Sequence, residues 1–217
     1  APYGEPKYKD LIIDKLMDLK EDGSFRLNMK YFDYATGLTM TNKNFANLFT
    51  KPVRDPKKEK LTQFHMDIAA SIQAVTEEVM LRMTKSIFDE YKINNLCLAG
   101  GVALNCVANG KVLKKGYFKN IWIQPASGDA GGSLGAALAY WYHELKKTRK
   151  FYKDQMKGSY LGPKFEDDFI KNELDNLGAK YKNLSRSEII ATSARELANN
   201  KILGWFQGRM EFGPRAL

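Results

Sequence analysis

Apolar residues recur at three- and four-residue steps over 62–91, and this spacing predicts one long amphipathic helix with Thr62 as its cap. The helix is expected to pack against a sheet. A shorter helix is predicted over 9–20. Apolar and polar residues then alternate over 25–29, which predicts a strand, and a second strand over 37–41 would complete a hairpin.

Two strand–turn–helix units follow the long helix. The first combines a strand over 95–99 with a helix over 102–115, and the second combines a strand over 119–124 with a helix over 130–147. Consecutive units of this kind form a parallel sheet, in which both turns lie at the same edge. The chain is therefore predicted to be an α/β protein with a ligand site at that edge.

The two turns carry glycines and one acidic residue. Gly100 and Gly101 let the backbone approach a ligand that a side chain would block, and the amides that open the following helices favour negative charge. Asp129 lies in the second turn. A carboxylate next to a phosphate needs a cation between them, so we interpret Asp129 as a ligand of a metal or of a magnesium–nucleotide complex. The alternative is structural, with the glycines serving tight packing and Asp129 capping its helix.

Beyond the second unit the pattern changes. Residues 148–164 are rich in lysine, aromatic residues, glycine and proline, and are predicted to form a linker. A capping box of Ser185 and Glu188 predicts the start of a helix. The elements expected after the linker are a helix over 166–176, a strand over 179–184, a helix over 185–199 and a strand over 201–206.

Length and composition narrow the class of protein. A chain of 217 residues with 44% hydrophobic residues can bury a sizeable core in one or two domains. It has no apolar run of about 18 residues, so no membrane contact is expected. The net charge is +9, but the lysines are scattered along the chain. No aromatic residues alternate with the densest lysine cluster, over 51–60, as a surface that binds single-stranded nucleic acid would need. No nucleic-acid binding is therefore expected. Cys97 and Cys106 have no Cys-x-x-Cys spacing, and we expect both to pack in the core of a reduced, cytoplasmic protein.

Three polar residues on the predicted helices receive no role in chemistry. His65, in the first turn of the long helix, is expected to cap it or to lie on the surface. His143 lies near the end of the helix over 130–147, where a cation suits the helix dipole. Gln73 could touch the site, but a position on the helix surface is the preferred interpretation.

Three long motifs resemble the carbamoyltransferase family that includes the nodulation and antibiotic-tailoring O-carbamoyltransferases. They are LAGGVALN (98–105), QPASGDAGGSLGAA (124–137) and GWFQGRMEFGPRAL (204–217). The motifs occur in the family's order, and the resemblance covers nearly the whole chain. It implies that 1–147 form the second subdomain of an actin-like ATPase (Kae1-like) fold, and that 165–217 begin a YrdC-like α/β domain.

The resemblance also implies the reaction. ATP and carbamoyl phosphate would form a carbamoyl-adenylate, with release of pyrophosphate and phosphate. The carbamoyl group would then pass to a hydroxyl group of a small-molecule acceptor. The implied cofactors are ATP and a divalent metal, either iron or magnesium. Assembly as a homodimer is left open.

By the same resemblance, each motif would contribute to the site. Asn105 would contact the nucleotide, and Asp129 would bind the metal. The nucleotide site would also be lined by four glycines, namely Gly100, Gly101, Gly131 and Gly132. Arg209 and Arg215 would lie near carbamoyl phosphate, because arginine suits bidentate recognition of phosphate. The alternative for both arginines is a solvated surface position.

The chain also departs from the family pattern. Family members are far longer, and the phosphate loop and histidine pair expected of the first actin-like subdomain are not visible here. We therefore expect an internal fragment that is inactive alone. Two other functions stay open, namely a small-molecule kinase of the actin-like superfamily and a non-catalytic nucleotide-binding module. The third motif argues against both, because neither needs a YrdC-like continuation. Threonylcarbamoyl transfer to tRNA is not supported by the weak basic patterning.

Overall fold

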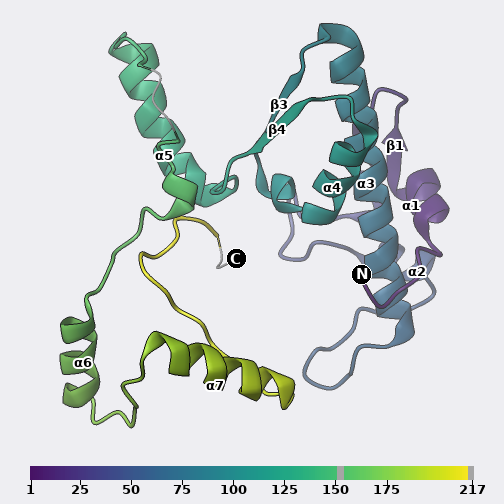
Figure 1. Ribbon diagram of the computed structural model, residues 1–217. Coiled ribbons are helices and arrows are strands. Elements are labelled where there is room, and N and C mark those ends of the chain that lie inside the picture. Colours follow the sequence, from purple (N-terminus) through teal and green to yellow (C-terminus); the bar gives the residue numbers. More distant parts are fainter. Residues whose placement is uncertain (151–153, 215–217) are drawn as a thin grey trace. The chain divides into compact units, whose positions relative to one another are not determined.

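The computed structural model describes residues 1–150 and 154–214. The chain divides into two compact units, Ala1–Ile123 and Gln124–Leu217. Helices and small sheets alternate along the first unit, so the predicted α/β class is confirmed at this level (Figure 1). The elements of the first unit are α1 (Lys9–Leu16), β1 (Met17–Leu19), β2 (Phe25–Leu27), α2 (Lys43–Leu48), α3 (Gln63–Tyr91), β3 (Asn95–Leu98), α4 (Cys106–Lys115) and β4 (Asn120–Ile123).

Helix α3 begins and ends where the sequence predicts. The Thr62 amide donates a hydrogen bond to His65 Nδ1 at 3.1 Å, and the Thr62 hydroxyl lies 2.8 Å from the same atom. His65 therefore has the capping role expected of it. Lys92 ends the helix in the left-handed conformation, with φ of 53°. A cap at each end satisfies backbone groups that the helix itself leaves unpaired.

The hairpin differs from the prediction. Strand β2 pairs in antiparallel register with β1, with Met17 opposite Leu27, and not with residues 37–41. Those residues form only one isolated bridge, between Phe32 and Thr41. The predicted helix over 9–20 was too long, because its last turn is β1. Three residues are too few to show whether apolar positions repeat every two or every 3.6 residues.

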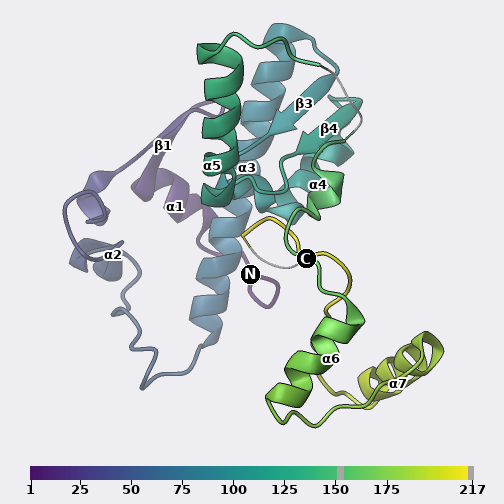
Figure 2. The same ribbon diagram turned by 90° about the vertical axis from the view of Figure 1, so that its left-hand side faces the viewer.

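Two apolar clusters lie on opposite sides of α3 (Figures 1 and 2). One buries residues of α1, the hairpin, α3 and the end of α2, and consists of Ile12, Leu16, Met17, Phe49, Val75 and Val79. The other is formed by Leu96, Val112 and Phe118 against the C-terminal half of α3. The long helix is thus the central element of the unit, and the β3–β4 sheet and α4 pack against one side of it.

The strands β3 and β4 are parallel, with Leu98 opposite Ile123, so both carboxyl ends lie at the same edge as predicted. One face of this sheet is packed and the other is exposed within the unit. Leu96 is buried, whereas Cys97 and its register partner Trp122 are exposed. The prediction that Cys97 and Cys106 pack in the core is wrong, because side chains alternate between the two faces of a strand and Cys106 begins an exposed turn of α4.

The second unit contains α5 (Asp129–Ala139), α6 (Asp167–Asn176) and α7 (Arg186–Ala198), and α5 continues into a wider turn over Tyr140–Glu144. Ser185 and Glu188 form the predicted capping box of α7. The strands predicted over 179–184 and 201–206 are not formed in this described part of the chain. An isolated strand has no partner for its backbone groups and is not stable alone. In the described residues, no helix combines the length and the apolar character needed to span a membrane.

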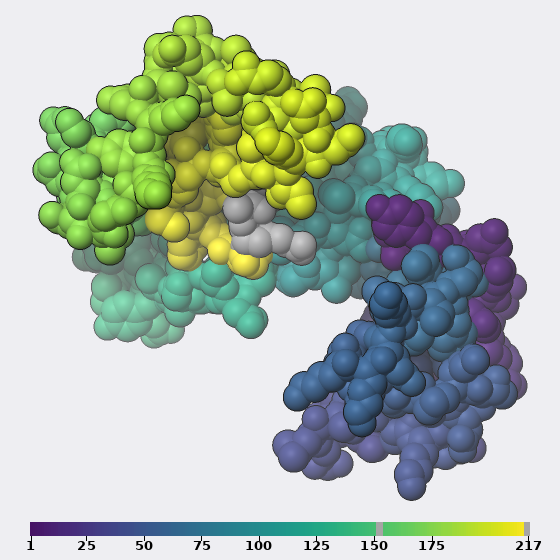
Figure 3. All heavy atoms as spheres, turned by 90° about the horizontal axis from the view of Figure 1, so that it is seen from below, coloured from purple at the N-terminus to yellow at the C-terminus, as the bar shows by residue number. Residues whose placement is uncertain are grey.

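The N-terminal segment is held against the start of α3 by a buried carboxylate. Asp67 is 4% exposed. It accepts hydrogen bonds from the Glu5 amide at 2.9 Å and from Gln63 Nε2 at 2.8 Å, and Lys7 Nζ lies 3.2 Å away. In Figure 3 the purple N-terminal residues lie against blue atoms of the same unit. The carboxylate of Asp67 therefore joins two segments about 60 residues apart in sequence.

We expect this contact to make stability depend on pH. The Glu5 amide and Gln63, together with Lys7, hold the pKa of Asp67 below its ordinary value of 3.8. A lowered pKa stabilises the folded state above the unfolded pKa, and this contribution is lost as the pH falls through the folded pKa. In urea unfolding, the deficit of an Asp67→Asn variant should be largest near neutral pH and should shrink below pH 3.8. A deficit independent of pH would contradict this role.

Candidate functional site

The turn after β3 has a backbone that requires glycine at one position. Gly100 has φ of +95°, a conformation that side chains disfavour. Its carbonyl accepts a hydrogen bond from the Ala103 amide at 2.9 Å, and the Asn105 amide bonds to the Val102 carbonyl at 2.9 Å. These bonds form a tight 3₁₀ turn over Gly101–Leu104, so α4 begins later than the predicted residue 102.

The space beside this turn is open within the chain. A Cβ atom built on Gly100 or on Gly101 would meet no atom within 4 Å. Gly100 is therefore explained by its backbone conformation, whereas no contact among the described residues explains Gly101. An open backbone at the carboxyl edge of a parallel sheet is the setting in which α/β proteins bind ligands.

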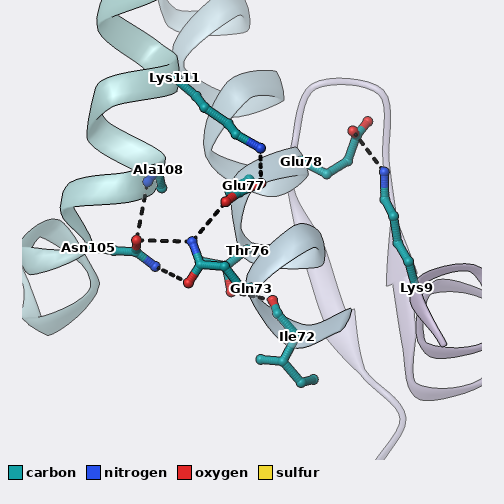
Figure 4. A network of polar contacts seen from close by, with 9 residues as sticks. All are labelled: Lys9, Ile72, Gln73, Thr76, Glu77, Glu78, Asn105, Ala108 and Lys111. Carbon is teal, nitrogen blue, oxygen red and sulfur yellow. Dashed lines mark hydrogen bonds and ion pairs between the residues drawn. The ribbon is translucent and has the colours of Figure 1, made fainter. Parts of the chain in front are cut away.

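Asn105 joins this turn to α4 and α3. Its Oδ1 accepts a hydrogen bond from the Ala108 amide at 3.1 Å and thereby caps α4. The same oxygen accepts a bond from Gln73 Nε2 at 3.1 Å, and Asn105 Nδ2 donates to Gln73 Oε1 at 2.9 Å (Figure 4). The interpretation of Gln73 as a surface residue is thus wrong, since its amide forms a reciprocal pair with that of Asn105.

An ion pair between a buried carboxylate and an exposed lysine lies next to the amide pair (Figure 4). Gln73 Nε2 also donates to Glu77 Oε1 at 2.9 Å, and Glu77 forms an ion pair with Lys111 of α4. Glu77 is 8% exposed. Burial acts to raise the pKa of Glu77, but hydrogen bonds from Lys111 and Gln73 outweigh it and hold the pKa below its ordinary value of 4.5. Glu77 is therefore ionised at neutral pH.

A second asparagine ties the turn to α4. Buried Asn109 donates from Nδ2 to the Ala103 carbonyl at 2.7 Å. Its Oδ1 is buried without a hydrogen-bond partner in the described part of the chain. Asn109, Glu77 and Lys111 lie outside the three sequence motifs. The four-residue spacing of Gln73 and Glu77 could have indicated a pair on one helix face, but the contacts to α4 depend on tertiary packing.

The second motif belongs to the other unit and opens α5. Asp129 is exposed in the first turn of α5, and within the described ranges its carboxylate forms no hydrogen bond or ion pair. A Cβ atom on Gly131 would overlap the Ala126 carbonyl, whereas one on Gly132 would meet nothing within 4 Å. Packing alone therefore requires glycine at 131. The hydroxyl of Ser127 is buried and has no partner among the residues described.

The third motif is paired with the segment predicted to be a linker. The Met210 amide bonds to the Pro163 carbonyl at 2.9 Å, and the Gly162 amide bonds to the Met210 carbonyl at 2.8 Å. Arg209 donates from Nη1 to the Gly162 carbonyl at 2.7 Å. The rest of its guanidinium group has further N–H donors for an anion. Arg215 lies outside the described residues.

The structure thus brings the predicted residues together in two groups. Gly100, Gly101 and Asn105 share one turn of the first unit, and Asp129 shares the start of α5 with the glycines at 131 and 132. Over the ranges that the structure describes, no three histidine, cysteine or acidic side chains gather as a metal site. Asp129 alone does not make up the ligand set of a divalent metal.

Comparison with known proteins identifies the family. Residues 1–138 match the family model described as carbamoyltransferase N-terminus, and residues 194–217 match the one described as carbamoyltransferase C-terminus. The chain therefore belongs to the carbamoyltransferase family, and the resemblance inferred from the three motifs is confirmed.

Several relatives match over the whole chain. An uncharacterised protein of Synechocystis sp. is 60% identical over 220 residues, which are 100% of this chain and 36% of that protein. Nodulation protein NolO of Bradyrhizobium diazoefficiens is 34% identical over 219 residues, covering 100% of this chain and 37% of the relative. Nodulation protein NolNO of Sinorhizobium fredii is 36% identical over 219 residues, covering 100% and 30%. The chain spans about a third of the length of these curated relatives.

Proposed function

We propose that the full-length protein is an ATP-dependent carbamoyltransferase and that this chain supplies part of its nucleotide site. The observation that carries the proposal is the match of both family models in the order N-terminus, then C-terminus. The two parallel strands, with the glycine turn that follows β3, support a Kae1-like, actin-type ATPase fold for the first part. The third motif supports a YrdC-like continuation.

The proposed reaction has two stages. The first forms carbamoyl-adenylate in two steps, and the second transfers its carbamoyl group to the acceptor. Water first converts carbamoyl phosphate to carbamate and phosphate. An oxygen of carbamate then attacks the α-phosphorus of ATP, which forms carbamoyl-adenylate and releases pyrophosphate. A hydroxyl oxygen of the acceptor next attacks the carbamoyl carbon, and AMP leaves with the electrons of the bond that breaks. Splitting the transfer in this way replaces one difficult step with two easier ones.

The residues of the chain would act mainly by binding and orientation. The open backbone at Gly100 and Gly101 would let the nucleotide approach the turn, and Asn105 would bind the nucleotide from the end of that turn. Gly132 would give similar access at α5. The free donors of Arg209 would bind the phosphate group of carbamoyl phosphate.

A bound divalent metal, iron or magnesium, would offset the negative charge of the phosphates. Asp129 would supply one ligand, and its exposed, unpaired carboxylate suits that role. Among the described residues, Asp129 belongs to no group of three or more histidine, cysteine or acidic side chains that could hold a metal ion. Two free, exposed cysteines suit a reducing compartment, in agreement with a cytoplasmic enzyme.

The test is pyrophosphate release by the full-length protein incubated with ATP and carbamoyl phosphate. We expect pyrophosphate to form only when carbamoyl phosphate is present. Transfer of the γ-phosphate to an acceptor would instead indicate a kinase of the actin-like superfamily. Binding of ATP with neither product would indicate a non-catalytic nucleotide-binding module.

A further inference from the structure

The amide of Asn105 has one hydrogen-bonding group left over. An asparagine side chain can accept about two hydrogen bonds at its oxygen and donate two from its nitrogen. Both acceptor positions are used, by the Ala108 amide and by Gln73 Nε2. One N–H is used by Gln73 Oε1, and the second has no partner in the chain as described. Asn105 is half-buried and lies at the end of the glycine turn, so this N–H is the side-chain donor left for a ligand.

The orientation of the neighbouring Gln73 amide is selected by charge. One N–H of Gln73 Nε2 points to Asn105 Oδ1 and the other to Glu77 Oε1. If the Gln73 amide were turned over, its oxygen would face the Glu77 carboxylate, and two acceptors would oppose each other. An ionised, buried carboxylate therefore holds the nitrogen of Gln73 towards itself. Lys111 keeps Glu77 in place from α4.

We propose that Gln73 and Glu77 are positioning residues that hold Asn105 so that it presents a single N–H donor to the nucleotide. The group that Asn105 contacts is then a hydrogen-bond acceptor, such as a ring nitrogen or an oxygen of ATP. The contact from α3 to the end of the turn also explains why a glutamine on a long amphipathic helix faces inward. The inference rests on the proposed nucleotide site.

The donor is tested by measuring the dissociation constant of ATP for the full-length protein by isothermal titration calorimetry. Asn105→Asp keeps an oxygen that caps α4 but removes both N–H donors, the outward one and the one to Gln73 Oε1. We expect this variant to weaken ATP binding about tenfold or more. Glu77→Gln keeps the size of the side chain but no longer selects one orientation of Gln73, and about a three- to tenfold loss is expected.

The structure offers a matched control on the next residue of α3 (Figure 4). Glu78 is half-buried and, like Glu77, forms ion pairs; its carboxylate lies 2.8 Å from Arg82 Nε and 3.4 Å from Lys9 Nζ, with no contact to Asn105. Glu78→Gln should leave the dissociation constant of ATP within about twofold. Gln73→Met, of similar volume, provides a second variant, and thermal unfolding of each variant reports whether the fold is kept.

A double variant separates positioning from general structural support. If Glu77 acts through Asn105, Glu77→Gln should have no further effect on ATP binding in the Asn105→Asp protein. An equal loss in both backgrounds would overturn the inference. Tight ATP binding by Asn105→Asp would overturn the assignment of the site itself. A weakened Asn105→Asp with unchanged Glu77→Gln and Gln73→Met would overturn only the positioning role.

Discussion

Replacing Asp129 with alanine is expected to reduce carbamoyl transfer by the full-length protein about 100-fold or more while leaving its fold intact. Removing a residue that only orients a metal ligand typically lowers metal affinity or activity about 10- to 100-fold. Removing the proposed metal ligand itself should therefore have a larger effect. Asp129 is exposed and bonds to no other residue in the described part of the chain. Its removal should therefore cost only its interaction with the helix dipole, about 0.3–1 kcal/mol.

Asp168 is a suitable control for this experiment. It is also an exposed aspartate in the first turn of a helix, α6, in the same unit. Asp168→Ala removes the same kind of interaction with a helix dipole, and transfer activity should not change. Activity is measured as formation of carbamoylated acceptor, and bound iron and magnesium are measured by elemental analysis. Near-normal activity and metal content of Asp129→Ala would refute the proposed role in metal binding.

Gly23→Ala is expected to be among the most destabilising substitutions in the first unit, with a loss of about 2–5 kcal/mol in the free energy of unfolding. Two costs combine at this position, in the turn between β1 and β2. Gly23 has φ of +88°, which strains a residue with a Cβ atom, and that atom would overlap the backbone nitrogen of Met83 on α3. The backbone of a long helix cannot move aside as the end of a flexible side chain can.

Two further glycines in this unit separate the two costs. Gly116, at the end of α4, has φ of +69° but open space around it, so Gly116→Ala should lose about 1–2 kcal/mol through strain alone. Gly110 lies inside α4 with open space and an ordinary backbone, so Gly110→Ala should stabilise the protein by about 0.5–1 kcal/mol. Urea unfolding of the three variants measures this order. A loss for Gly23→Ala no larger than that for Gly116→Ala would contradict the close packing of the hairpin on α3.

Elements with long signals, or within the strand–turn–helix units, could be predicted from the sequence, whereas short elements outside such units could not. Helix α3 was predicted to within a residue because its apolar stripe spans many turns and a capping residue precedes it. The strands predicted over 179–184 and 201–206 have no such support, and a strand exists only when another strand pairs with it. Strand β1 was interpreted as helix for the same reason, since its partner determines its conformation.

The candidate site shows a similar division. The glycine turns, Asn105 and Asp129 are predicted as site residues because they belong to contiguous motifs, and they remain predictions. Gln73, Glu77 and Lys111 were missed or misinterpreted because each is an ordinary residue on a helix, and their chemistry arises from contacts between α3 and α4. Cys97 was placed in the core because it belongs to an apolar strand, but the strand's packed face does not include it.

The sequence by itself determined the family, the parallel order of β3 and β4 and the extent of α3, because these depend on local patterns and contiguous motifs. Only the tertiary structure decided which face of the small sheet is packed, which strand completes the hairpin, and that a buried carboxylate on α3 orients the amides beside the glycine turn. These features depend on contacts between residues far apart in the chain. The local pattern of apolar and polar residues does not predict such contacts.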